Sequence, residues 1–108
     1  MMLDIHIADS FDAATRNDPV ARIDLNVHTA FFNERITLAN DCPHLQRLND
    51  HFSDCSFAGD DLQALLREID TVSKRIMATS PHQTWMKQLH DACQTAMANG
   101  DSIFMFCD

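Results

Sequence analysis

The strongest constraint on the fold lies in residues 60–78, where apolar side chains recur at steps of three and four. The recurring residues are Leu62, Leu65, Leu66, Ile69, Val72 and Ile76. This spacing places an apolar stripe along one side of a helix. Asp60 or Asp61 stands where a helix cap is expected. We therefore predict an amphipathic helix from residue 60 to about residue 78, with its stripe against the core.

A second helix and a strand are predicted after this one. The tripeptide TSP ends the first helix, and residues 82–99 again have helical spacing, with Gly100 as the C-terminal cap. Residues 102–107, SIFMFC, form a short apolar run. Such a run is typical of a strand that is buried on both faces.

Alternating patterns dominate the N-terminal part of the chain. Residues 2–8 alternate between apolar and polar side chains, which predicts a half-buried strand. Residues 9–19 are polar and end in NDP, which indicates a connection. Residues 20–27 alternate again and favour a second strand. However, Asp18-Pro19 also makes a good helix start.

Two arrangements therefore remain open over residues 19–38: a strand followed by a helix at about 28–38, or one long helix. Beyond them, Pro43 begins a short predicted helix, and the alternation around residues 52–57 suggests a short strand at a sheet edge. The chain has 108 residues, a common size for one domain. We expect a single α+β domain, residues 1–108, with a sheet of about four strands and helices packed on it.

The chain is strongly acidic, and the acidity is uneven. The formal net charge is −8. Residues 1–61 carry 11 acidic residues and 4 arginines, a net −7, and residues 62–108 carry 5 acidic and 4 basic residues, a net −1. This balance disfavours nucleic acid and anionic membranes as partners, because both attract basic proteins. It favours a basic protein partner. A homodimer would not exclude such a partner.

The cysteines are expected to be reduced thiols. The N-terminal residues MMLDIHIADSF lack the features of a secretory signal. A cytoplasmic chain keeps its thiols reduced. We therefore interpret the four cysteines as small hydrophobic residues in or near the core: Cys42, Cys55, Cys93 and Cys107.

No spacing in the sequence predicts a reaction. Zinc sites usually show pairs such as C-x2-C or H-E-x-x-H, and neither occurs here. Cys42, His44, His51 and Cys55 could ligate a metal only if the fold gathered them. With two glycines, the chain cannot form a glycine-rich phosphate loop. We expect no catalytic residues, no metal and no cofactor.

The layout of the chain resembles small immunity proteins of bacterial polymorphic-toxin systems. The likeness is carried by LDIHIADSFD, by DDLQALLREIDTV, and by MKQLHDACQTAMANG running into DSIFMFCD with its A-x-x-x-G-x-x-I-x-x-x-x-D ending. The resemblance implies a cytoplasmic protein without enzymatic activity that binds and neutralises one toxin domain. Such toxins often have basic clefts, which an acidic inhibitor would occlude.

The stretch CPHLQRLNDHFSDCSFAGDD, residues 42–61, is the best candidate for an acidic contact face. The predicted partner-binding residues are Asp41, Asp50, Asp54, Asp60 and Asp61. Three alternatives remain. They are a phage-type anti-defence protein or nucleic-acid mimic, a small metal or thiol enzyme that uses the histidines and cysteines, and a structural subunit or adaptor.

Overall fold

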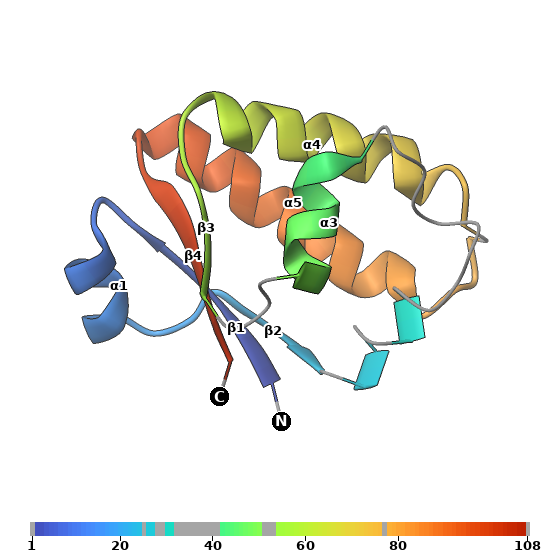
Figure 1. Cartoon of the computed structure of the whole chain (residues 1–108), viewed down its shortest axis with the longest axis horizontal. Helices are drawn as coiled ribbons and strands as arrows, with labels where there is room; N and C mark the ends of the chain where they lie inside the picture. Colours follow the sequence, from blue (N-terminus) through green and yellow to red (C-terminus); the bar gives the residue numbers. More distant parts are fainter. Residues whose placement is uncertain are drawn as a thin grey trace.

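The protein folds into a four-stranded antiparallel sheet with helices, the α+β architecture predicted from the sequence (Figure 1). The computed structural model describes residues 2–24, 26–27, 30–31, 42–50, 54–76 and 78–107, with the backbone alone for 48–50, 54 and 107. The elements in chain order are β1 (Met2–Ala8), α1 (Phe11–Arg16), β2 (Ala21–Asp24), α3 (Pro43–Asp50), β3 (Asp54–Phe57), α4 (Asp60–Ser73), α5 (His82–Asn99) and β4 (Ser102–Cys107).

The two central strands come from opposite ends of the chain. The strand order is β2-β1-β4-β3, and Leu3 pairs with Cys107 across the centre of the sheet. The two ends of the chain therefore lie close together in Figure 1. Strand β3 lies at one edge of the sheet, as its shortness and charge predicted.

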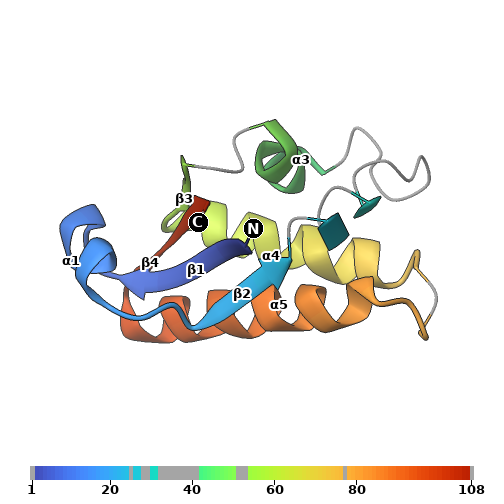
Figure 2. The ribbon, with the colours of Figure 1, turned by 90° about the horizontal axis from the view of Figure 1, so that it is seen from below.

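Helices α5, α4 and α3 stack on one face of the sheet. Helix α5 contacts β1, β2 and β4, while α4 packs on α5 and α3 packs on α4. Figure 2 shows α4 between α5 and α3. The sheet presents Leu3, Ile5, Ile103 and Met105 to the core, and all four are fully buried. Removing these four alternating side chains from water is the main way in which the sheet stabilises the fold.

The two long helices largely follow the predicted pattern. Helix α5 has the predicted bounds, and Gly100 ends it in the left-handed conformation, with φ 70°. Helix α4 ends at Ser73, earlier than predicted. The side-chain amide of Gln83 donates to the carbonyl oxygen of Ser73 at 2.9 Å. This contact from α5 satisfies a carbonyl group at the helix end, where the helix itself offers no partner.

The prediction of a plain connection over residues 9–19 was wrong, because the segment contains α1. Ser10 caps this helix, and its Oγ accepts from the backbone N–H of Ala13 at 3.1 Å. Ala14 is the only fully buried residue of α1. A helix with one buried residue has no apolar stripe, so periodicity could not reveal it.

The open choice over residues 19–38 is resolved where the structure describes the chain. Strand β2 covers Ala21–Asp24, which excludes one long helix, and residues 26–27 and 30–31 have helical backbone. Asp24 Oδ1 accepts from the backbone N–H of Asn26 at 2.7 Å, which marks the change from strand to helix. The remainder of the helix predicted at 28–38 lies outside the described residues.

One face of β4 is only partly buried, which corrects the prediction of a strand buried on both faces. Ile103 and Met105 face the core, whereas Phe104 and Phe106 alternate onto the opposite side and remain partly exposed. We call this side the outer sheet face. By strand alternation and register it includes Asp4, His6, Arg22, Ser56, Phe104 and Phe106. Helix α1 covers one end of it.

Candidate functional site

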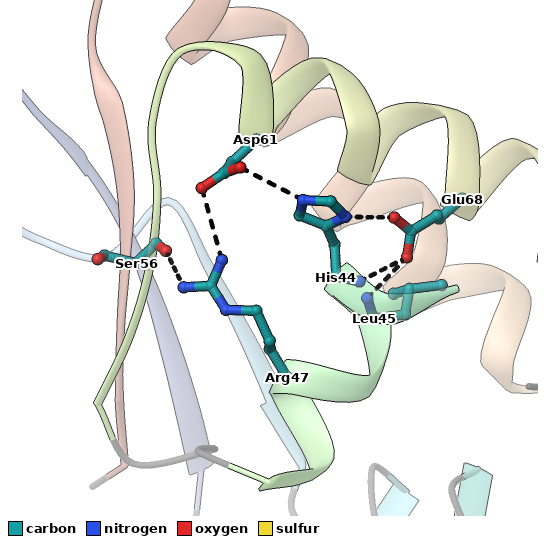
Figure 3. A network of polar contacts seen from close by, with 6 residues as sticks. All are labelled: His44, Leu45, Arg47, Ser56, Asp61 and Glu68. Atoms are coloured by element: carbon teal, nitrogen blue, oxygen red, sulfur yellow. Dashed lines mark hydrogen bonds and ion pairs between the residues drawn. The ribbon is translucent and has the colours of Figure 1, made fainter. Parts of the chain in front are cut away.

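Helix α3, strand β3 and the first turn of α4 meet around the predicted acidic stretch (Figure 3). Asp60 and Asp61 are exposed in the first turn of α4. Neither is the cap that was predicted, because Gly59 is the N-cap residue and no side chain caps this helix. Two carboxylates in a first turn still interact favourably with the helix dipole.

The other predicted contact residues are described less fully. Asp41 lies outside the described residues. Asp50 ends α3 and Asp54 begins β3, and the structure describes only the backbone of both. The two residues therefore stand at the two ends of the connection between α3 and β3, and their role in binding stays a prediction.

Asp61 is held by two side chains from α3. One of its oxygens, Oδ1, lies 3.3 Å from His44 Nε2, and the other, Oδ2, lies 3.6 Å from Arg47 Nη1. The Asp61 side chain is 52% exposed. Asp60 has no ion pair within the described part of the chain. The stretch thus presents one oriented carboxylate beside one that is free to meet a partner.

Glu68 is the residue that organises this region, and sequence reasoning missed it. Its Oε2 lies 2.5 Å from His44 Nδ1, while its Oε1 accepts from the backbone N–H groups of His44 at 2.8 Å and of Leu45 at 3.0 Å. These N–H groups belong to the first turn of α3, which has no internal acceptors for them. A buried carboxylate from α4 therefore caps α3 (Figure 3).

A signal for this role was present in the sequence. Glu68 stands three residues after Leu65 and four before Val72, both of which are fully buried. A glutamate at such a position must be paired or hydrogen-bonded, because burying an isolated charge is costly. The identity of its partner depends on how α3 packs on α4, and the sequence does not show that packing.

Arg47 fixes the other side of α3 to the sheet edge. Its Nη2 donates to the carbonyl oxygen of Ser56 at 2.9 Å, and its guanidinium carbon lies 4.5 Å from the centre of the Phe57 ring. The first contact occupies a backbone acceptor of the edge strand β3, and the second is a cation–π interaction. Arg47 therefore covers part of this edge.

The geometry suits positioning better than proton transfer. Both ring nitrogens of His44 face carboxylate oxygens. An ionised carboxylate can accept hydrogen bonds but cannot donate them. A general base needs a free nitrogen directed at a substrate proton. His44 instead links α3 to α4 through Glu68 and Asp61.

A second group of charged side chains lies at the groove between α4 and α5, which encloses about 510 Å³. His90 Nε2 lies 3.3 Å from Asp70 Oδ1 on α4, and its Nδ1 lies 3.7 Å from Asp91 Oδ1. The hydrogen bond from Lys87 lowers the pKa of Asp91. The neighbours His90 and Asp91 are therefore in ion-pair contact with each other, and His90 also lowers the pKa of Asp91.

The cysteines behave as small hydrophobic residues where their side chains are described. Cys42, Cys55 and Cys93 are buried. Burial raises the pKa of the Cys55 thiol, and the positive charge of Arg47 partly offsets this effect. Within the described ranges, no group of three or more histidine, cysteine, aspartate or glutamate side chains is arranged to hold a metal ion. His51, one of the four residues considered for zinc, lies outside those ranges.

Replacing Cys93 by alanine is expected to reduce the slope with which the free energy of unfolding falls at alkaline pH. Burial raises the pKa of the Cys93 thiol to about 12, whereas an unfolded thiol ionises near about 8.5. Above that lower pH the unfolded chain releases a proton that the folded chain keeps. The free energy of unfolding therefore falls as pH rises toward the folded pKa, by at most about 1.4 kcal/mol per pH unit.

Guanidinium unfolding at several pH values between about 8 and about 11, followed by the fluorescence of Trp85, measures this effect. The chain has no tyrosine, so phenol ionisation does not add to the alkaline transition. Lysine and arginine are the same in both proteins. Parallel stability curves for the two proteins would contradict the assignment of a strongly raised pKa to Cys93.

Comparisons with known proteins give no relative. No family model, no curated protein and no solved structure matches the chain. Among the described helices, none has the length and apolar character needed to cross a membrane.

Proposed function

We propose that this protein is an immunity-type inhibitor, which binds and neutralises one basic toxin domain in the cytoplasm. Its formal net charge of −8 supports attraction to a basic partner. The layout resemblance described above points to the same class of protein. The proposal assigns no catalytic role to any residue.

The observation that carries the proposal is the arrangement at the start of α4. Asp60 and Asp61 are exposed side by side, and α3 holds Asp61 in one orientation through His44 and Arg47. An oriented carboxylate loses less conformational freedom on binding a lysine or arginine than a free one does. Asp50 ends α3 and Asp54 begins β3, and we include both in the proposed acidic contact face.

Expression of the chain together with its neighbouring open reading frames tests the proposed function. We expect one neighbouring product to be toxic alone, to lose its toxicity when this protein is present, and to co-purify with it in equal amounts. A neighbouring toxin that stays active beside a folded, abundant copy of this protein would contradict the proposal.

A double charge reversal, Asp54→Lys with Asp60→Lys, is expected to slow association with that partner about tenfold or more at low salt. Asp60 is chosen over Asp61 because it has no ion pair among the described residues. The matched control is Asp70→Lys with Asp91→Lys, which changes the net charge equally on the α4 and α5 surfaces. Association rates measured by biolayer interferometry at two salt concentrations should fall for the first variant only. An equal fall for both would contradict the acidic contact face.

A further inference from the structure

Three phenylalanines form an aromatic cluster on the outer sheet face: Phe11, Phe104 and Phe106. The ring of Phe11 stands edge-on to the other two, with centroids 6.2 Å from Phe104 and 5.6 Å from Phe106. Phe11 nevertheless remains 60% exposed. Its other side therefore offers apolar surface to a partner.

The cluster borders a hollow of about 400 Å³ on the side of β3 and β4. Its lining is formed by Phe11, Cys55, Ser56, Phe104, Met105 and Phe106. The rings of Phe11, Phe104 and Phe106 are its apolar side chains on this face, whereas Cys55 and Met105 are buried toward the core. A hollow of this volume can hold one large apolar side chain, and buried anchors of this kind carry much of the energy of protein interfaces.

The cluster is rigidly held, because α1 is tied to the sheet. Asn17 Oδ1 lies 2.8 Å from His6 Nδ1, and the Asn17 amide donates to the carbonyl oxygen of Ile7 at 2.8 Å. The His6 ring in turn packs against Phe106 at 5.1 Å. A surface that is ordered before binding loses less entropy when a partner docks.

The segment that carries Phe11 is acidic. Residues 2–24, which form β1, α1 and β2, carry five aspartates and two arginines, a net charge of −3. Asp9 and Asp18 are exposed and have no ion pair in the part of the chain that the structure describes. Asp12 and Arg16 pair with each other at 3.0 Å. An apolar centre with an acidic surround is complementary to a basic partner rather than to a second copy of this chain.

We propose that the outer sheet face is a docking surface for a protein segment that presents an apolar side chain flanked by lysines or arginines. The apolar side chain fills the hollow beside the aromatic cluster, and the basic groups meet Asp9 and Asp18. This inference rests on the proposed function, because it locates a second contact with the same basic partner. The acidic contact face and the outer sheet face meet along β3.

A synthetic twelve-residue peptide that alternates leucine and lysine is the probe, and a leucine–glutamate peptide is its control. Each is titrated into the ¹⁵N-labelled protein and followed by amide chemical shifts. The lysine peptide is expected to shift α1 and β4, and Phe11→Gln is expected to weaken its binding about tenfold. The matched variant Met97→Gln alters an exposed methionine on α5 and should leave the affinity unchanged.

Shifts confined to other elements, equal binding of the glutamate peptide, or no effect of Phe11→Gln would overturn the inference. Sedimentation tests for a dimer of this protein. A dimer that Phe11→Gln abolishes would also overturn the inference and would assign this face to a second copy. The proposed function fails separately. If the protein neutralises a toxin and Phe11→Gln leaves the affinity for that toxin unchanged, the proposed function stands and this docking surface is overturned. If the lysine peptide binds specifically but no toxin is neutralised, the docking surface stands and the proposed function is overturned.

Discussion

Replacing Glu68 by alanine is expected to lower the free energy of unfolding by about 3 kcal/mol. The substitution removes the acceptor of two backbone N–H groups at the start of α3 and the partner of His44 Nδ1. Each buried donor left without an acceptor costs about 1–3 kcal/mol. Urea unfolding followed by the fluorescence of Trp85 measures the change.

Two variants separate this capping role from a general effect on α4. Glu68→Gln keeps an oxygen acceptor but loses the charge, so it should cost less than alanine. Asp70→Ala removes an acidic side chain of the same helix that is 60% exposed, and it should change stability by less than about 0.5 kcal/mol. A loss below about 1 kcal/mol for Glu68→Ala would show that α3 does not depend on this carboxylate.

Replacing Trp85 by alanine is expected to cost about 4 kcal/mol, the largest effect of a single substitution that we predict. Trp85 is 3% exposed and stands edge-on to Phe31, with ring centroids 5.0 Å apart. Its indole N–H donates to His82 Nδ1 at 3.1 Å. Alanine would remove this contact area and leave a cavity between α5 and the segment that holds Phe31.

Circular dichroism must follow this unfolding, because Trp85 is the only tryptophan of the chain. Trp85→Phe is the control, since it keeps an aromatic ring and loses the hydrogen bond and part of the volume. We expect it to cost about half as much as alanine, roughly 2 kcal/mol. Equal stability of the alanine variant and the wild type would contradict the placement of Trp85 in the core.

The parts of the fold that local patterns dictate were predicted from the sequence. Strand β1 buries Leu3 and Ile5, two residues apart, and helix α5 buries apolar residues at steps of three and four, so the period of each pattern identifies its element. The left-handed Gly100 completes α5 because glycine tolerates that conformation. Helix α1 was missed, since only Ala14 of its residues is fully buried.

The candidate site could be predicted only in part. The acidic stretch is visible in the sequence, and Asp60 and Asp61 are indeed exposed. The contacts that orient Asp61 join α3 to α4 across 14 and 17 residues of chain, and no local pattern encodes them. Glu68 and His44 are likewise 24 residues apart. Such pairs depend on tertiary packing, which a single sequence does not display.

The central position of β1 and β4 has a consequence for how the chain folds. Leu3 pairs with Cys107, so the middle of the sheet closes a loop that contains every other element of the fold. Pairing between such distant segments slows folding. During synthesis, β1 can pair with β2 early, but it cannot pair with β4 until β4 has left the ribosome. Until then its β4-facing edge stays unpaired, and the nascent chain is open to non-native strand pairing.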